Sequence, residues 1–341
     1  MKNYLLQLAE QRSFSEEQMH EAVDFILGEE VSESEIAAFL MGLKSKGETV
    51  DEIAGIVRAM KGKTLRFNQM FPNVLDNCGT GGDGSSSFNV STTSAFVIAG
   101  AGIPVAKHGN RSISSKTGSA DVLEYLGVNL NLPSEKTEEI LQEIGIAFLF
   151  APHVHPKLKK VMTVRKELKI PTIFNYIGPL TNPIELDYQL LGVNRRDLLN
   201  VFAEVLKKLG RKRAVVINGA GFMDEASLQG ENHYTLLEDG KITSHIFTPE
   251  DVNLPQYDNS QIKGGDSKEN GEILLNVLKG EKGAPRDTVL LNAGIGIYTA
   301  GKASSIVEGI EVAKEIIDSG AAYAKLTTLV EKSKIGQKEA I

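Results

Sequence analysis

The sequence predicts an α/β protein in which a small all-helical domain precedes a larger α/β domain with a central mixed sheet flanked by helices. Helix-capping signals recur through the first 65 residues, and short apolar strands alternate with helices from Pro72 onward. A hairpin pattern between Tyr234 and Phe247, with Asp239-Gly240 at its turn, adds antiparallel strands. The chain has 341 residues, 41% of them hydrophobic, which is enough for two domains.

The helical part is indicated by a Ser/Thr-x-x-Glu/Gln box at Ser15 to Gln18, Ser32 to Glu35 and Thr49 to Glu52. In such a box the first and the last side chain each accept a hydrogen bond from a backbone N–H group at the start of a helix. An apolar stripe follows each box: Met19, Val23 and Ile26; Ile36, Phe39, Leu40 and Leu43; and Ile53, Ile56, Val57 and Met60. These stripes must pack on one another, on a second domain or on another subunit.

The α/β part is indicated by apolar runs of strand length that alternate with helical patterns. The expected strands are near Val74-Leu75, Ile103 to Ala106, Ile146 to Phe150, Leu190 to Val193 and Val215 to Ile217. The expected helices cover Ser91 to Gly100, Ser119 to Gly127, Pro156 to Leu168, Arg196 to Leu209 and, closing the chain, about Ser304 to Ser319.

Composition excludes several classes of protein. The net charge of −7 argues against a general nucleic-acid binder, which needs surplus Lys and Arg. The longest apolar runs fall far short of the roughly 20 residues that cross a bilayer, and no signal peptide follows Met1. The single cysteine, Cys78, forms no internal disulfide and fits a reducing compartment. We expect a cytoplasmic protein with no membrane association.

A glycine-rich loop is the strongest local signal. Four glycines lie between Gly79 and Gly84, and Asn89 to Thr92 then open a helix. Glycines let the backbone approach a ligand closely, and a helix start offers free N–H groups and a positive dipole end. The segment therefore reads as an anion cradle, with a flexible loop before an ordinary capped helix as the alternative. The spacing fits neither a Walker A loop nor a dinucleotide fingerprint.

Two further segments carry polar groups after strands. Residues Lys107 to Lys116 offer positive side chains and hydroxyls before a helix that Ser119 can cap. Such a loop at the end of a strand suits a phosphate-rich substrate, and the alternative is a solvated turn with scattered charge. Asp224-Glu225 follows the strand around Val216, and adjacent carboxylates can bind magnesium, although such pairs also occur in solvated loops.

Basic and histidine side chains near residue 160 are less specific. Arg165 lies in the basic helix Lys157 to Lys169, most of whose positive charges are expected to face solvent, yet a guanidinium is the natural bidentate partner of a planar carboxylate. His153 and His155 have no third clustered ligand nearby in the sequence, so we interpret them as structural residues rather than as metal ligands.

Several motifs together resemble the anthranilate phosphoribosyltransferase family, and the resemblance spans nearly the whole chain. The matching segments are Gly79 to Gly84, Asn89 to Thr92, Lys107 to Ser112, Ser114 to Leu123, Asn175 to Pro183, Asp224-Glu225 and Gly301 to Ala303. Ser87 stands where threonine is common in the family, and Asn218 stands where histidine is usual.

The resemblance implies the arrangement of domains. Residues 1–66 and about 165–186 would form the helical domain, which pairs two subunits into a homodimer. Residues 73–164 and 187–341 would form the α/β domain that binds phosphoribosyl pyrophosphate, with the active site in the cleft between the domains. Magnesium is the implied cofactor, as two ions of which one arrives with the substrate.

The resemblance also assigns residues. Anthranilate would be bound by Gly79, Asn110 and Arg165, and magnesium by Ser91, Asp224 and Glu225. Phosphoribosyl pyrophosphate would be bound by Gly79, Gly82, Asp83, Ser87, Asn89, Val90, Ser91, Thr92, Lys107, His108, Gly109, Asn110, Arg111, Ser112, Ile113, Ser114, Ser115 and Ser119. No protein nucleophile is implied.

The implied reaction joins the amine of anthranilate to the ribose carbon of phosphoribosyl pyrophosphate, with release of pyrophosphate, in tryptophan biosynthesis. One alternative is a pyrimidine nucleoside phosphorylase, which is similar in fold, although this chain is short for the extra C-terminal domain of that family. The other is a non-enzymatic nucleic-acid-binding relative, against which the acidic composition speaks.

Overall fold

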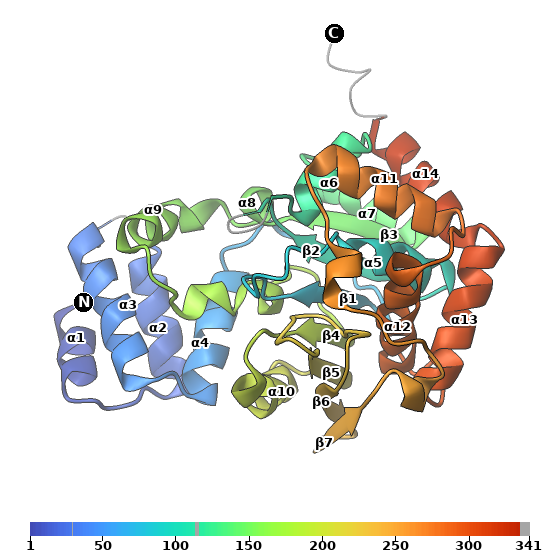
Figure 1. The fold of residues 1–341 in the computed structure, drawn as a ribbon. Coiled ribbons are helices and arrows are strands. Elements are labelled where there is room, and N and C mark those ends of the chain that lie inside the picture. The colour runs from blue at the N-terminus through green and yellow to red at the C-terminus, as the bar shows by residue number, and fades with distance from the viewer. Residues whose placement is uncertain (29, 113–115, 335–341) are drawn as a thin grey trace, which may run out of the picture.

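The computed structural model describes residues 1–28, 30–112 and 116–334, and a helical module lies beside an α/β body (Figure 1). The first helices are α1 (Lys2–Ala9), α2 (Glu16–Ile26), α3 (Glu33–Lys46) and α4 (Val50–Lys61). The three predicted capping boxes are present at Ser15, Ser32 and Thr49, each of which accepts a hydrogen bond from the third residue of its helix. The helix α1, which has no box, was not predicted.

The α/β body follows from residue 75. Its strands are β1 (Leu75–Gly79), β2 (Val105–Gly109), β3 (Ile146–Phe150), β4 (Tyr188–Gly192), β5 (Arg213–Asn218), β6 (Asn232–Glu238) and β7 (Lys241–Phe247). Its helices are α5 (Val90–Gly100), α6 (Ser119–Tyr125), α7 (Ser134–Ile144), α8 (Ala151–Val154), α9 (Lys159–Leu168), α10 (Leu199–Lys208), α11 (Ser267–Leu278), α12 (Ala284–Thr299), α13 (Ile306–Asp318) and α14 (Ala321–Lys334).

The seven strands form one sheet in the order β3-β2-β1-β4-β5-β6-β7. Strands β1 to β5 run parallel, while β6 and β7 are antiparallel, so the prediction of a mixed sheet is confirmed. The register pairs Leu75 with Tyr188 and Gly79 with Gly192, and the carboxyl ends of β1 and β4 therefore lie next to each other. Ligands of open α/β sheets bind at this edge.

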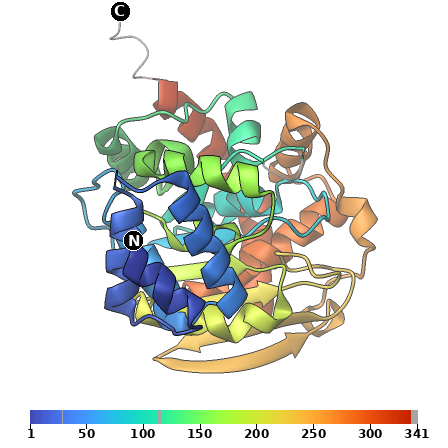
Figure 2. The ribbon, with the colours of Figure 1, turned by 90° about the vertical axis from the view of Figure 1, so that its left-hand side faces the viewer.

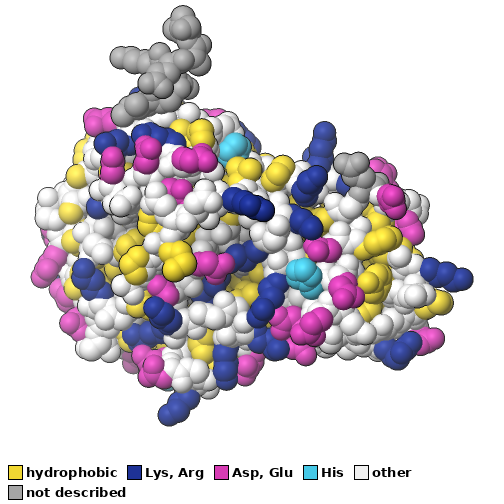
Figure 3. Space-filling view, turned by 180° about the vertical axis from the view of Figure 1, so that it is seen from behind, with side chains coloured by type: hydrophobic (Ala, Val, Ile, Leu, Met, Phe, Trp, Pro, Cys, Tyr) yellow, Lys and Arg dark blue, Asp and Glu magenta, His cyan; other side chains and the backbone are white. Residues whose placement is uncertain are grey.

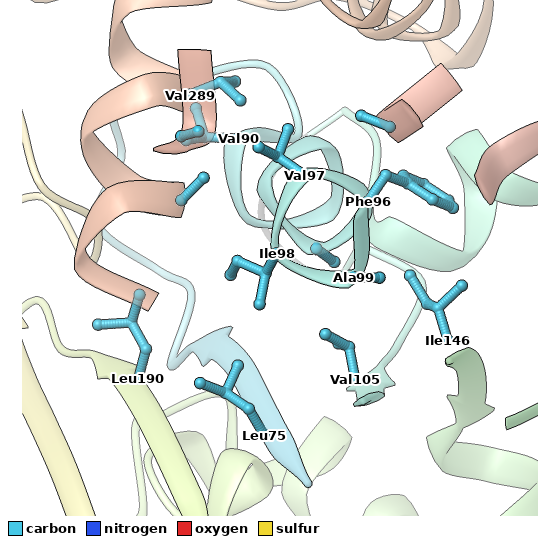
Figure 4. Packing of buried hydrophobic residues seen from close by; sticks show 14 of the residues in the cluster. Leu75, Val90, Phe96, Val97, Ile98, Ala99, Val105, Ile146, Leu190 and Val289 are labelled. Carbon is cyan, nitrogen blue, oxygen red and sulfur yellow. The ribbon is translucent and has the colours of Figure 1, made fainter. Parts of the chain in front are cut away.

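Two apolar cores lie on opposite faces of the sheet, because successive strand residues point to opposite sides. Leu190 and Val215 belong to the core around α5, which packs over β1 and β2 and beside α12 (Figure 4). Leu191 and Val216 belong to the second core, which continues through α10 into α1 to α4. The helix α9 packs on α3, and the turned view shows it lying across the N-terminal helices (Figure 2).

The structure corrects two expectations. The chain does not end with the helix around residues 304–319, because α14 follows α13 after a turn at Gly320. Ser119 is the first residue of α6 rather than its cap: Gly118 holds the cap position, and its N–H donates to Asp121 Oδ2 at 2.8 Å. No helix in the described part of the chain is long and apolar enough to span a membrane. The boundaries of the two domains stay a prediction.

Candidate active site

Three glycines at the carboxyl ends of neighbouring strands make room for the acidic loop. A Cβ atom on Gly79, at the end of β1, would lie 2.1 Å from Asp224 Oδ2. On Gly192, at the end of β4, it would lie 1.6 Å from the carbonyl oxygen of Asp224. On Gly219, just after β5, it would lie 2.1 Å from the carbonyl oxygen of Glu225. The acidic pair therefore rests directly on the strand ends, where only glycine leaves space.

The glycine-rich loop contacts this pair. Gly81 and Gly82 have φ values of +71° and +75°, which suit glycine, and the Gly81 N–H donates to Asp224 Oδ2 at 2.6 Å. The Asp224 N–H donates in return to Asp83 Oδ2 at 3.4 Å. Asn194, after β4, donates to the Gly81 carbonyl oxygen at 3.0 Å. The segments near residues 80 and 224, predicted to share one pocket, are therefore in direct contact.

The first turn of α5 faces the same place. Asn89 holds the cap position, but its side chain makes no capping hydrogen bond; it bonds the Thr117 carbonyl oxygen and Asn270 instead. The Val90 N–H donates to the Phe88 carbonyl oxygen at 2.7 Å and the Ser91 N–H donates to Glu225, so the N–H groups that a helix start offers to an anion are here partly taken by the chain itself. Of the other predicted residues here, Val90 and Thr92 are buried in this turn, and Ser87 pairs with Lys263 in an isolated bridge.

The acidic pair carries more negative charge than its surroundings neutralise. Burial, and then the charge of Asp83, raise the pKa of Asp224 to about 7. Burial and the neighbouring Asp224 raise the pKa of Glu225 well above its usual range, an effect that Lys107 and the Ser91 N–H only partly offset. Glu225 Oε2 is buried and has no hydrogen-bond partner among the described residues. Such a site favours binding of a cation.

Lys107 supplies the nearest positive charge. It is 2% exposed and donates to the Asn77 carbonyl oxygen at 2.9 Å. Burial lowers its pKa, while Cys78, Asp76 and the acidic pair oppose that shift. One buried ammonium group faces several carboxyl groups whose raised pKa values favour protonation, and a divalent cation bound there would take the place of those protons.

The residues present fit magnesium. Among residues 1–28, 30–112 and 116–334, no three His, Cys, Asp or Glu side chains form a metal site by themselves. Magnesium does not require one, since it is commonly held by one or two carboxylates, waters and substrate phosphates. Asp224 and Glu225, with the Ser91 hydroxyl nearby on α5, are the donors that match this pattern.

The second polar loop is held by contacts with α6 and with the segment around Gly178. His108 is buried, and its Nδ1 lies 3.1 Å from the Gly178 carbonyl oxygen. Arg111 pairs with Asp121 and Glu124, so its charge is already engaged by α6. Gly109 ends β2, the Asn110 carbonyl oxygen accepts from the Ala120 N–H at 3.2 Å, and the Ser112 N–H donates to Asp121. The predicted residues Ile113, Ser114 and Ser115 lie outside the described residues.

Arg165 lies on α9 and faces the segment that follows that helix. Its Nη2 donates to Asn175 Oδ1 at 3.2 Å, and its Cζ lies 5.6 Å from the centre of the Phe174 ring. In the described chain no hydrogen bond joins it to Asn110 or Gly79, so a shared acceptor site stays a prediction. The His155 ring packs on His108 at 5.2 Å, and His153 bonds the Leu132 carbonyl oxygen, in line with structural roles.

Comparison with known proteins agrees with this geometry. Residues 71–323 match the family described as "Glycosyl transferase family, a/b domain", and residues 2–63 match its "helical bundle domain". The anthranilate phosphoribosyltransferase of Bacillus cereus (strain B4264) is 55% identical over 333 residues, which cover 98% of both chains. The chain belongs to the anthranilate phosphoribosyltransferase family.

Solved structures of anthranilate phosphoribosyltransferases superpose on nearly the whole chain. The enzyme from Thermus thermophilus has a TM-score of 0.92 at 40% identity and covers 97% of this chain and 99% of its own. The enzyme from Saccharomyces cerevisiae, in complex with PRPP and Mg, has a TM-score of 0.89 at 26% identity, with 97% of each chain covered. The predicted family, fold, enzyme class and place in tryptophan biosynthesis are confirmed.

Sequence reasoning missed three residues around the acidic loop. Gly192 looks like the ordinary end of a strand, and Asn194 and Asn292 carry no motif. Their contacts with Asp224, Gly81 and Ala226 join segments that are 32 to 113 residues apart. The only local signal was the position of Gly192 after an apolar strand, which predicts a turn and not a contact with Asp224.

Proposed function

We propose that the chain transfers the phosphoribosyl group of phosphoribosyl pyrophosphate to the amine of anthranilate, with pyrophosphate as the leaving group. The observation that carries the proposal is the position of the acidic pair, which contacts the glycine loop and lies at the start of α5. One of its oxygens, Glu225 Oε2, has no hydrogen-bond partner among the described residues. An anion cradle beside surplus carboxylates suits a diphosphate that arrives with magnesium. The yeast relative was solved with PRPP and Mg.

The residues of the site would bind either the magnesium ion or the departing pyrophosphate. Asp224, Glu225 and the Ser91 hydroxyl would hold magnesium, which supplies charge neutralisation to the departing pyrophosphate. Two ions, one of them arriving with the diphosphate, fit the surplus of carboxylates. Lys107 and the N–H groups of the glycine loop would orient the diphosphate and stabilise the charge that develops on it.

The acceptor would be oriented by Arg165 and Asn110, with the backbone of Gly79 beside the amine. Arg165 pairs bidentately with a planar carboxylate, and burial already lowers its pKa, so an anionic partner there is favourable. The aromatic amine is neutral near pH 7. Alignment of the two substrates therefore suffices without a protein nucleophile. A relative was solved with 4-fluoroanthranilate.

The proposal includes a cytoplasmic homodimer joined through the helical module. Leu6, Phe25 and Met41 on α1, α2 and α3 are 50%, 44% and 38% exposed, and exposed apolar side chains favour burial against a second subunit. Sedimentation at micromolar concentration should give twice the mass of the chain, and Phe25→Glu should halve it.

One experiment tests the reaction. Anthranilate fluorescence should fall when phosphoribosyl pyrophosphate and Mg²⁺ are added together, and neither addition alone should have an effect. Phosphate-dependent release of base from a nucleoside would favour the phosphorylase instead. Retardation of DNA at physiological salt without turnover would favour a nucleic-acid binder. Seen from behind, basic and acidic side chains are interspersed over the surface, which speaks against that outcome (Figure 3).

A further inference from the structure

Two buried asparagines hold the backbone on either side of the acidic pair, and neither has a role in the proposed chemistry. Asn218 ends β5, and its Nδ2 donates to the carbonyl oxygens of Val193 at 2.8 Å and Met223 at 3.2 Å. Its Oδ1 accepts from Arg196 Nε at 3.0 Å, which fixes the orientation of the amide. The residue just before Asp224 is thereby tied to the ends of β4 and β5.

Asn292 does the same on the other side. It lies in α12, and its Oδ1 accepts from the Ala226 N–H at 3.0 Å. Its Nδ2 donates to the carbonyl oxygens of Ala226 and Thr288, both at 2.9 Å. Ala226, the residue just after Glu225, is thereby hydrogen-bonded to α12.

The acidic pair needs such support because its own charges oppose its position. Asp83 lies against Asp224, and Glu225 Oε2 is buried without a hydrogen-bond partner among the described residues, so hydration favours a loop that swings outward. Asn218 is 0% exposed and Asn292 is 5% exposed, so water does not readily replace their hydrogen bonds. Their amides keep Met223 and Ala226 in place while the charges of the two residues between them are only partly compensated.

We propose that Asn218 and Asn292 are positioning residues that hold Asp224 and Glu225 in the geometry that binds magnesium with the diphosphate. The proposal rests on the proposed metal role of the acidic pair. The asparagines act through the backbone at Met223 and Ala226, and their loss should affect the metal and the diphosphate but not anthranilate.

The test compares Asn218→Ala and Asn292→Ala with a matched control. Asn232 is also 0% exposed; it donates to the Ser227 and Gly230 carbonyl oxygens and accepts from the Ser227 N–H. Asn232→Ala therefore removes as many buried hydrogen bonds without releasing Met223 or Ala226. The Mg²⁺ dependence of the rate is measured together with binding of Mn²⁺, followed by electron paramagnetic resonance in the presence of phosphoribosyl pyrophosphate.

Each of the first two variants should raise the half-saturating Mg²⁺ concentration on the order of tenfold and weaken Mn²⁺ binding equally, since each loses buried hydrogen bonds. The KM for anthranilate should change less than about twofold. Asn232→Ala should lower Tm and leave the metal response unchanged. If Asn218→Ala does not fold, Arg196→Ala, which frees the Asn218 amide and also removes the contact of Arg196 with the Phe222 ring, should give a smaller shift in the same direction.

An equal shift in Asn232→Ala, or no shift in folded Asn218 and Asn292 variants, would overturn the positioning role. Asp224→Asn separates this failure from that of the proposed function. If it leaves Mn²⁺ binding intact, the metal assignment itself is wrong. If it abolishes Mn²⁺ binding while the asparagine variants bind normally, only the positioning role is lost.

Discussion

Two glutamates, Glu52 in the helical module and Glu225 at the strand ends, differ in how far neighbouring groups compensate their negative charge. Glu52 is 0% exposed and accepts from Lys46 Nζ at 2.8 Å and from the N–H groups of Phe14 at 2.9 Å and Thr49 at 2.8 Å. Glu225 lies beside Asp224 and Asp83, and one of its oxygens has no partner in the described structure. The charge of Glu52 is compensated within the chain, and the charge of Glu225 is compensated only in part.

This difference in charge compensation indicates which of the two glutamates has a functional role. An uncompensated carboxylate costs folding free energy, so it persists only where the chain gains from it. At Glu225 the missing compensation is what magnesium and a diphosphate would bring. At Glu52 the protein has supplied the partner already, and only stability depends on that residue.

The largest effect is expected for Glu52→Ala. Removal of one member of a buried ion pair should lower the free energy of unfolding by about 3–5 kcal/mol, because Lys46 is left uncompensated. Urea denaturation measures this loss, and kcat per folded molecule should not change. Glu35→Ala, at the same box position of α3 but without a buried ion pair, should cost far less. Equal losses in the two variants would remove the contrast on which the comparison rests.

The double variant Asp224→Asn with Glu225→Gln should behave in the opposite way. Activity should fall about 10²–10³-fold, since the charge on the leaving group loses its stabilisation. In EDTA, however, the Tm should stay the same or rise, because two repelling charges are gone. Calorimetry in EDTA and the fluorescence assay with Mg²⁺ measure both effects. A lower Tm in EDTA would show that these carboxylates stabilise the fold, contrary to our interpretation.

Two glycine variants compare the strand ends with the helical module directly. Gly192→Ala should lower kcat/KM for phosphoribosyl pyrophosphate about 10²-fold, because the new Cβ must displace the carbonyl oxygen of Asp224 from 1.6 Å. Gly62→Ala, at the end of α4, meets its nearest atom at 3.4 Å and should leave the kinetics unchanged. Should Gly192→Ala retain full kcat/KM, the position of Asp224 would not matter for catalysis.

The same contrast explains what could be predicted from the sequence. A capping box is local, so the helices that start after Ser15, Ser32 and Thr49 could be read directly. The helix α12 was missed because it is buried on nearly all sides and shows no periodic contrast. At the site, the glycine loop and the acidic pair were visible as motifs. The contacts of Gly192, Asn218 and Asn292 were not, because they exist only after distant segments meet.

The smallest expected effect is a pH dependence that belongs to Asp224. Its pKa is raised to about 7, so between its ordinary value of 3.8 and about 7 the folded protein binds a proton more tightly than the unfolded chain. The contribution of Asp224 to stability therefore falls as the pH rises through this range. The buried histidines act in the other direction: burial lowers the pKa of His108 to about 3 and that of His155 to about 4, so they favour the folded state as the pH rises towards 6.5.

A single stability curve mixes these opposing contributions, and a difference between two proteins separates them. In metal-free buffer the Tm of Asp224→Asn should exceed that of the unchanged protein by an amount that is small near pH 4 and largest above pH 7, because only the carboxylate differs. Mg²⁺ with phosphoribosyl pyrophosphate should abolish the gap or reverse it, since the ligands bind the ionised form. A gap that stays constant with pH would mean that Asp224 is compensated within the chain, as Glu52 is, and the two regions would then not differ.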